Sequence, residues 1–123
     1  MAKIAIKFLD ADALGAPKLS AVRLLEDKAV FAKFAAITEA LISEWPRFNA
    51  PHYFQPMRGE LAGFQEIRIQ TSRSNVRFFT RVIEMDGEVL LIVAGAAKPR
   101  RTGFQESLYL KVLRLYSAFL TSE

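Results

Sequence analysis

Arginines fall at alternating positions in two short, largely apolar segments that are typical of neighbouring strands. Side chains on a strand alternate between its two faces. Arg68 therefore shares a face with Glu66, and Arg77 shares a face with Phe79 and Arg81. The intervening positions are more apolar, so we expect them to pack against helices while the arginines lie on an uncovered face. This pattern predicts a basic sheet face with one aromatic ring within it.

Further basic residues lie in the loops at the ends of these strands. Arg73 falls in the loop between the first two strands, and Lys98, Arg100 and Arg101 form a loop after the third. The planar fork of arginine matches phosphate oxygens, and an exposed aromatic ring can stack on an unpaired base. We therefore expect a polynucleotide ligand. The expected RNA-binding residues are Glu66, Arg73, Phe79, Arg81 and Arg100.

The chemistry that such a face favours is RNA cleavage without a metal. A ribose 2′-hydroxyl attacks the adjacent phosphorus, and arginines stabilise the charge that grows on the phosphoryl oxygens. Lys98 can move the proton if the neighbouring cations lower its pKa, and Tyr109 and Glu66 are the second and third candidates. The expected catalytic residues are Arg68, Arg77, Lys98 and Arg101.

A purely structural interpretation stays open, in which the strand arginines pair with Glu66 and Glu84 across the sheet. Other chemistries are poorly supported. The chain has no cysteine, a single histidine at position 52 and no glycine-rich phosphate motif. Glu84, Asp86 and Glu88 flank an Asp-Gly turn, where acidic residues are common. We therefore expect neither a metal ion nor a cofactor.

The composition predicts one basic domain over residues 1–123. Hydrophobic residues make up 51% of the chain, which excludes intrinsic disorder, and the net charge of +4 favours a polyanion as partner. No stretch approaches the roughly 20 apolar residues of a membrane span. The first residues lack the pattern of a secretory signal, so we expect a cytoplasmic protein with no membrane partner.

The elements that must position these side chains follow from periodicity and turn residues. Residues 3–9 predict a strand, residues 10–17 a connection, and residues 18–45 a helical region with a break near 26–27. Residues 47–63 have the composition of a loop. Three strands are expected over 64–71, 76–84 and 88–94, and a last helix over 102–120.

This order predicts a small α+β domain, an antiparallel meander with helices against one face and the first strand joined to the sheet edge by a long connection. The last helix carries two adjacent apolar stripes. One is Phe104, Leu108, Val112, Leu115 and Phe119, and the other is Tyr109, Leu113, Tyr116 and Leu120. Either both stripes are buried against the N-terminal helices, which we favour, or one packs on the sheet and the second meets another chain.

Several segments in the second half of the chain resemble toxins of the RelE/ParE superfamily, especially the phage-related HigB-like branch. Residues 56–72, which include Glu66 and Arg68, resemble the family stretch that ends in Glu-Leu-Arg. Residues 75–83 resemble the following strand with its arginine. Residues 90–95 and 98–102 resemble the apolar strand and the basic loop before the last helix. The resemblance covers about residues 56–120.

The resemblance implies a β-α-(α)-β-β-β-α fold and the toxin of a type II toxin–antitoxin pair. Such toxins are ribosome-dependent endoribonucleases that cleave mRNA and arrest growth, and a helix-turn-helix antitoxin binds and neutralises them. Carried over by position, the family's Glu and Arg fall on Glu66 and Arg68, its next Arg on Arg77, and its basic loop on Lys98 with Arg100 or Arg101. Where many relatives have a histidine, this chain has Ala94.

Two alternatives to an mRNA interferase follow from the same resemblance. One is a ParE-like inhibitor of DNA gyrase. The other is a non-catalytic member that only binds an antitoxin or nucleic acid. Cleavage of mRNA on translating ribosomes distinguishes the mRNA interferase from both alternatives.

Overall fold

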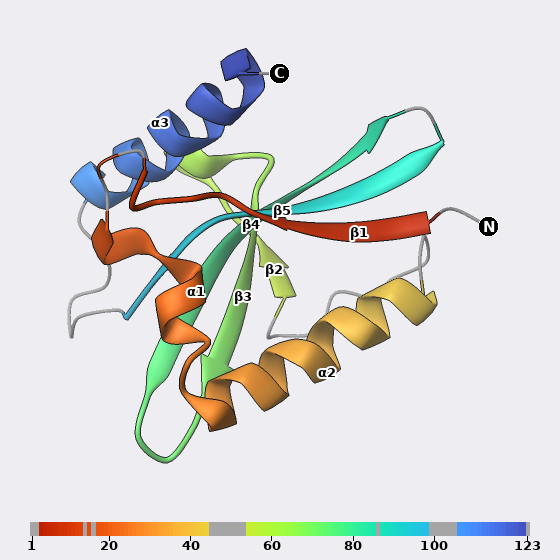
Figure 1. The fold of residues 1–123 in the computed structure, drawn as a ribbon, viewed down its shortest axis with the longest axis vertical. Coiled ribbons are helices and arrows are strands. Elements are labelled where there is room, and N and C mark those ends of the chain that lie inside the picture. Colours follow the sequence, from red (N-terminus) through yellow and green to blue (C-terminus); the bar gives the residue numbers. More distant parts are fainter. Residues whose placement is uncertain are drawn as a thin grey trace.

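A five-stranded mixed sheet forms the centre of the computed structural model, which describes residues 3–13, 15, 17–44, 54–85, 87–98 and 106–122 (Figure 1). The strand order is β1-β5-β4-β3-β2. The strands are β1 (Lys3–Phe8), β2 (Phe54–Pro56), β3 (Gln65–Gln70), β4 (Asn75–Met85) and β5 (Glu88–Ala97). The expected α+β class is therefore confirmed.

The sheet combines one parallel edge with an antiparallel meander. β3, β4 and β5 pair antiparallel in chain order, and β1 pairs parallel with β5 so that Phe8 lies opposite Val93. A parallel pair needs a long crossover, which confirms that the first strand reaches the sheet edge by a long connection. β2 adds a short antiparallel strand beside the first half of β3 and was predicted as loop.

The predicted break in the first helical region is present. α1 (Ala21–Leu24) is capped at its end by Leu25. α2 (Lys28–Glu44) begins directly after Asp27. The Asp27 side chain accepts hydrogen bonds from the backbone N–H groups of Ala29 and Val30, so it caps the start of α2. Pro46, the expected stop of this helix, lies outside the described residues.

One sheet face carries the expected apolar core under α2. Ile67, Ile69 and Phe78 are 1% exposed or less and pack against α2 through Phe34, whose ring lies 4.9 Å from that of Phe78. The alternation predicted for β3 and β4 is thus confirmed: their apolar set faces α2, and Glu66, Arg68, Arg77 and their neighbours face the other way.

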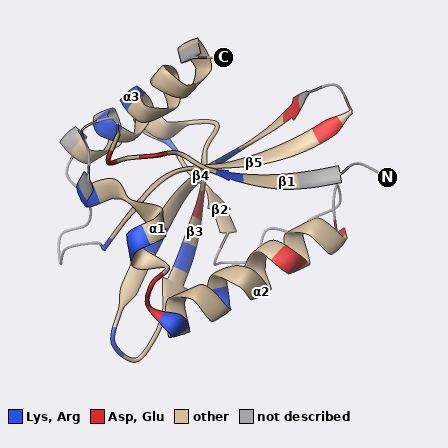
Figure 2. Cartoon of the chain, viewed as in Figure 1, with Lys and Arg blue, Asp and Glu red and all other residues tan. Residues whose placement is uncertain are grey.

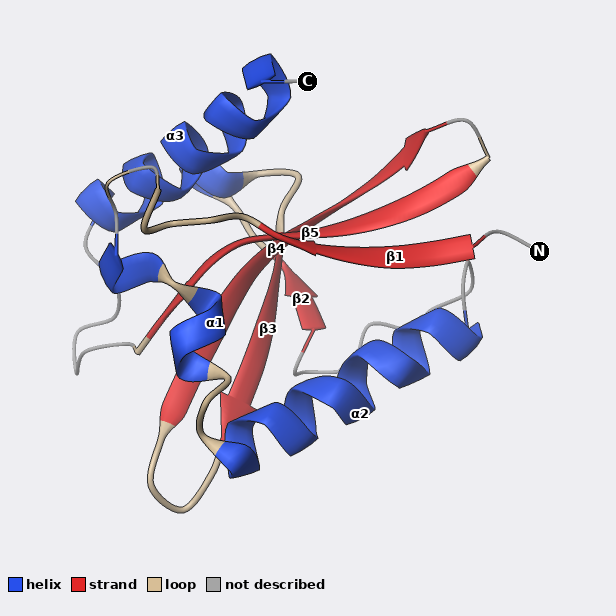
Figure 3. Ribbon diagram, viewed as in Figure 1, coloured by secondary structure: helices blue, strands red, loops and turns tan. Residues whose placement is uncertain are grey.

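The prediction that all helices pack on one face is wrong. α3 (Glu106–Ser122) lies on the side of the sheet opposite α2 (Figures 1 and 3). Its Val112 and Leu115 are buried with Phe64 and Ile92 of the sheet in a second core. The physical reason is that this face also carries large apolar side chains, which must be covered. The expectation that both α3 stripes bury against the N-terminal helices is wrong with respect to α2, which covers the other face: Tyr109, Leu113 and Tyr116 of the second stripe pack against this core, and Leu120 is half exposed.

A β-bulge sits in the middle of the sheet. Phe79 pairs with Gly95 and Thr80 with Val93, so Ala94 is the extra residue on β5. Gly95 packs tightly, because a Cβ there would lie 3.4 Å from the backbone oxygen of Leu19. The bulge lets β5 continue to Ala97, three residues beyond the predicted end, and brings Ala97 opposite Arg77.

Candidate functional site

Arg68 and Arg77 face each other across β3 and β4 as direct cross-strand partners. Both guanidinium groups donate to the same carboxylate oxygen. Arg68 Nε and Arg77 Nη1 each lie 2.7 Å from Oε1 of Glu66. The Glu66 side chain is only 8% exposed, whereas that of Arg68 is 49% exposed. We call this group the Glu66–Arg68–Arg77 triad.

The triad is an electrostatically costly arrangement. Like charges directly opposite each other on a sheet destabilise it, and a single buried carboxylate offsets two cations here. Three formal charges therefore sum to +1. Pairing of the strand arginines with Glu66, the structural alternative, is confirmed, but Glu84 is exposed and makes no ion pair within the described residues.

The triad keeps hydrogen-bond donors available for a ligand. Arg68 engages Glu66 through Nε, and its two Nη atoms have no carboxylate partner within the described residues. Arg77 Nε also has no acceptor in that same part of the chain, but it is buried, so the donors open to a ligand are those of the half-exposed Arg68. A phosphate has several acceptor oxygens that fit the fork of a guanidinium.

Tyr109 adds a phenol from α3 to the same region. Its ring packs edge-on against Phe79, 6.1 Å between centroids. Burial raises the pKa of the Tyr109 phenol above its usual value of 10.0, the negative charges of Glu66 and Glu60 raise it further, and Arg77 opposes them. An ordinary phenol is already protonated at neutral pH, so the shift leaves Tyr109 a hydrogen-bond donor and makes it a weaker acid. Sequence reasoning ranked it second to Lys98.

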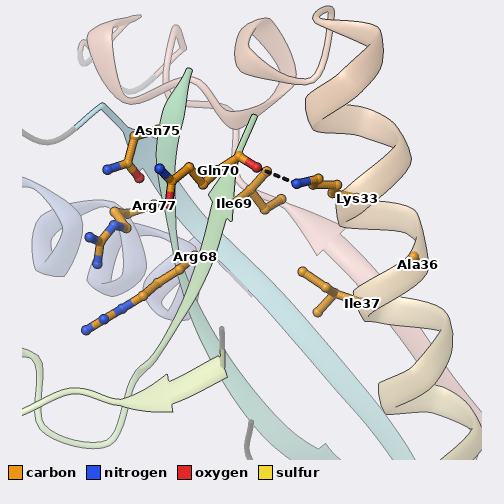
Figure 4. A pocket seen from close by; sticks show the side chains of 8 residues that line it. All are labelled: Lys33, Ala36, Ile37, Arg68, Ile69, Gln70, Asn75 and Arg77. Atoms are coloured by element: carbon orange, nitrogen blue, oxygen red, sulfur yellow. Dashed lines mark hydrogen bonds between the residues drawn. The ribbon is translucent and has the colours of Figure 1, made fainter. Parts of the chain in front are cut away.

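Two amide side chains extend the polar row toward the hairpin. Gln70 pairs with Asn75, two residues further along each strand than the Arg68–Arg77 pair. All four side chains project to the same side of β3 (Figure 4). Neither amide was predicted as a site residue. The signal was present in the alternation, because Gln70 follows Arg68 by two positions.

A cavity of about 520 Å³ opens at this end of β3 (Figure 4). Its lining comes from both sides of the strand, and is formed by Lys33, Ala36, Ile37, Arg68, Ile69, Gln70, Asn75 and Arg77. Lys33, on α2, donates a hydrogen bond to the backbone carbonyl of Gln70. Its contribution could not be seen in the sequence, because it depends on where α2 crosses the sheet.

Phe79 is not an exposed stacking surface, and that prediction is wrong. Its side chain is 0% exposed, because α3 covers the sheet face on which it lies. It packs against Tyr109 and contributes to the second core. Phe79 therefore lies on the predicted face of the sheet, but as a buried core residue.

Arg81 lies on the predicted face but away from the triad. Its guanidinium is 5.4 Å from the ring centres of both Phe64 and Tyr116, so two aromatic faces hold the cation. Gly63 passes close by, since a Cβ there would lie 2.9 Å from Arg81 Nη1. Arg81 therefore links β4 to α3, and the structure does not bring it to the triad as an RNA-binding residue.

The loop residues divide into two groups. Lys98 is exposed and directly follows Ala97, the strand partner of Arg77, so the chain brings it to the same end of the sheet. Arg73 is exposed in the β3–β4 loop, beyond Gln70 and Asn75. Arg100 and Arg101, and the helix start expected at Thr102, lie outside the described residues.

The site's charged groups are mainly basic. In Figure 2, β3 carries one acidic and one basic position, and basic positions mark the first half of α2. Within the described residues, no group of three or more His, Asp or Glu side chains is arranged to hold a metal ion. None of the helices described is long and apolar enough to cross a bilayer.

The chain matches no protein-family model, and comparisons with curated proteins and with solved structures give no match either.

Proposed function

We propose that the protein is an endoribonuclease that cleaves mRNA on the ribosome, the toxin of a toxin–antitoxin pair, and that the triad is its reaction centre. The observation that carries the proposal is the convergence of Arg68 and Arg77 on the buried Glu66 carboxylate, whose strand partner Phe79 packs against the ring of Tyr109. Base, acid and charge-stabilising groups thus lie together at one end of one sheet face.

The triad residues have distinct roles in the proposed reaction. The 2′-hydroxyl attacks phosphorus as its proton passes to the Glu66 carboxylate, and the bond to the 5′ oxygen of the next nucleotide breaks. The guanidinium groups of Arg68 and Arg77 stabilise the negative charge that develops on the phosphoryl oxygens. The products are a 2′,3′-cyclic phosphate and a free 5′-hydroxyl.

The departing 5′ oxygen needs a proton, and two groups are placed to give it. Tyr109 feels the charges of Glu66 and Arg77 and, like any tyrosine, carries its proton at neutral pH. Lys98 follows the strand partner of Arg77 and is exposed. We assign the proton to Tyr109, since its phenol already interacts with Glu66 and Arg77. Lys98 then serves to hold phosphate.

The partners follow from the same proposal. A ribosome-bound mRNA is the substrate, and a helix-turn-helix antitoxin is the inhibitor in the cytoplasm. Growth arrest on induced expression tests this function in the cell. We expect arrest with the natural chain and with Arg114→Ala, an exposed arginine on α3, and normal growth with Arg77→Ala. Normal growth with the natural chain at full expression would overturn the proposal.

Binding without cleavage is the second candidate. It is favoured by one observation: Glu66 Oε1 accepts from both arginines at 2.7 Å, so this oxygen already has two donors before any substrate binds. A protein of this kind would bind RNA with an affinity that depends on Arg77 and leave every linkage intact.

A further inference from the structure

The cavity at the end of β3 continues past the triad to the opposite side of the sheet. Arg68 and Arg77 project to the α3 side of β3, and Lys33 and Ile37 approach from α2 on the other side (Figure 4). Gln70 joins the two sides, because its backbone carbonyl accepts from Lys33 while its side chain lies with the arginines. A ligand in this cavity therefore contacts cations on both sides of the strand.

The Lys33 charge is not offset by protein. Its ammonium bonds to a neutral carbonyl, and within the described residues no carboxylate forms an ion pair with it. With the triad's +1, the cavity carries an excess of positive charge. That excess, together with the amides of Gln70 and Asn75, suits an anion that also offers hydrogen-bonding groups.

α2 carries its basic residues nearer its start and its acidic residues nearer its end. Lys28 and Lys33 lie in the first half of α2, and Glu39 and Glu44 in the second (Figure 2). This order opposes the helix dipole, which favours acidic groups near the start and basic groups near the end. Lys33 is the sixth residue of α2, beyond the first turn where this effect is strong, so the dipole neither favours nor excludes a lysine there.

We propose that the cavity is a second RNA-binding subsite, in which Lys33 holds the phosphate of a nucleotide next to the cleaved linkage. This inference rests on the proposed function and extends it. The strand of RNA passes from the arginines, over the end of β3 at Gln70 and Asn75, to Lys33 on α2. The volume of about 520 Å³ is within the range of pockets that enclose small molecules.

Binding of short RNAs of increasing length tests this path. The probes are fluorescent single-stranded RNAs with 2′-O-methyl groups, which block cleavage, as a dinucleotide and as a hexanucleotide. We expect Lys33→Ala to weaken hexanucleotide binding about tenfold at low salt and to leave the dinucleotide unchanged, because only the longer probe reaches past the triad. The slope of the logarithm of the binding constant against the logarithm of the salt concentration should become shallower by about 0.7, the value for one lost phosphate contact.

Matched variants separate the outcomes. Lys33→Arg should retain hexanucleotide binding, and Lys7→Ala, an exposed lysine of β1 at the other edge of the sheet, should have no effect. Unchanged hexanucleotide binding in Lys33→Ala, with weakened binding in Arg77→Ala, overturns the subsite and leaves the proposed function standing. Unchanged binding in both overturns the proposed function as well. A poly-glutamate peptide is added as a competitor for the labelled hexanucleotide. If it displaces the probe from the natural chain as well as unlabelled RNA does, and fails to do so in Lys33→Ala, the cavity binds acidic peptides and the RNA subsite is overturned.

Discussion

Arg77 Nη1 lies 2.7 Å from Glu66 Oε1, a diagonal contact between β4 and β3, because the direct strand partner of Arg77 is the like-charged Arg68. The sheet register thus creates a repulsive pair, and Glu66 offsets it from the next position on the same face. The consequence is a compact centre in which stability and the proposed chemistry depend on one carboxylate.

Replacement of Glu66 by glutamine should therefore reduce both stability and activity. Glu66→Gln keeps the size of the side chain but leaves the two arginines without a counter-charge, and we expect the free energy of unfolding to fall by about 2 kcal/mol. Urea denaturation measures the change. Glu84→Gln, at an exposed position on the next strand, is the control and should lie within about 0.5 kcal/mol of the natural chain. Equal stability of the two variants would show that the triad contributes nothing to the fold.

Loss of the Tyr109 hydroxyl should reduce cleavage without loss of RNA affinity. Tyr109→Phe keeps the ring packed on Phe79 and removes the proton that we assign to the 5′ oxygen. We expect a fall in the single-turnover cleavage rate of about 10²-fold or more. Binding of the non-cleavable hexanucleotide should be unchanged. A cleavage rate equal to that of the natural chain would show that Tyr109 is not the proton donor. Lys98 would then be the next residue to test.

The raised pKa of Tyr109 also predicts an alkaline stability difference. A pKa that is higher in the folded state than in the unfolded state contributes stability that is fully present below the unfolded value of about 10. This contribution is lost as the pH rises through the higher folded value. The natural chain should therefore lose more stability between pH 9 and pH 11 than Tyr109→Phe does. Parallel stability curves for the two proteins would contradict the burial of the phenol.

Truncation of Phe79 should act on the fold alone. The ring is fully buried under α3, so Phe79→Ala should lower the free energy of unfolding by about 3–5 kcal/mol. Phe79→Leu fills most of the space and should cost much less. RNA affinity per folded molecule of Phe79→Leu should equal that of the natural chain. A selective loss of RNA affinity in this variant would restore Phe79 as a stacking residue.

Removal of Arg81 should loosen the contact between β4 and α3. Its guanidinium lies against both Phe64 and Tyr116, so Arg81→Ala should cost about 1–2 kcal/mol in thermal or urea denaturation. Arg114→Ala, which removes an exposed arginine from α3, provides the comparison and should be close to neutral. A smaller effect of Arg81→Ala than of Arg114→Ala would contradict the two-ring contact.

The polar row of the candidate site could be predicted from residue order alone. Strand alternation has a period of two, so placing Ile67 and Ile69 toward helices was enough to place Glu66, Arg68 and Gln70 together on the other face. The antiparallel register then brought Arg77 opposite Arg68. These relations are local, and a short hairpin transmits them with little freedom.

The cover of that face could not be predicted in the same way. Counting apolar residues on β4 alone favours an open face beside Phe79, but Ile92 of β5 and Phe64, just before β3, belong to the same core and require α3 above them. Counting the apolar side chains on this face requires knowing which segments lie side by side in the sheet, and these segments are distant in sequence. The contribution of Lys33 needs the path of α2 across the sheet for the same reason.

The end groups of RNA fragments test the central proposal most directly. The natural chain and Arg77→Ala are added to ribosomes translating an end-labelled mRNA, with Arg114→Ala as control, and the new ends are identified chemically. We predict fragments with a 2′,3′-cyclic phosphate and a 5′-hydroxyl for the natural chain and the control, and a cleavage rate at least 10²-fold lower for Arg77→Ala. Intact mRNA with the natural chain, or equal cleavage by Arg77→Ala, would contradict the assignment of the Glu66–Arg68–Arg77 triad as the reaction centre.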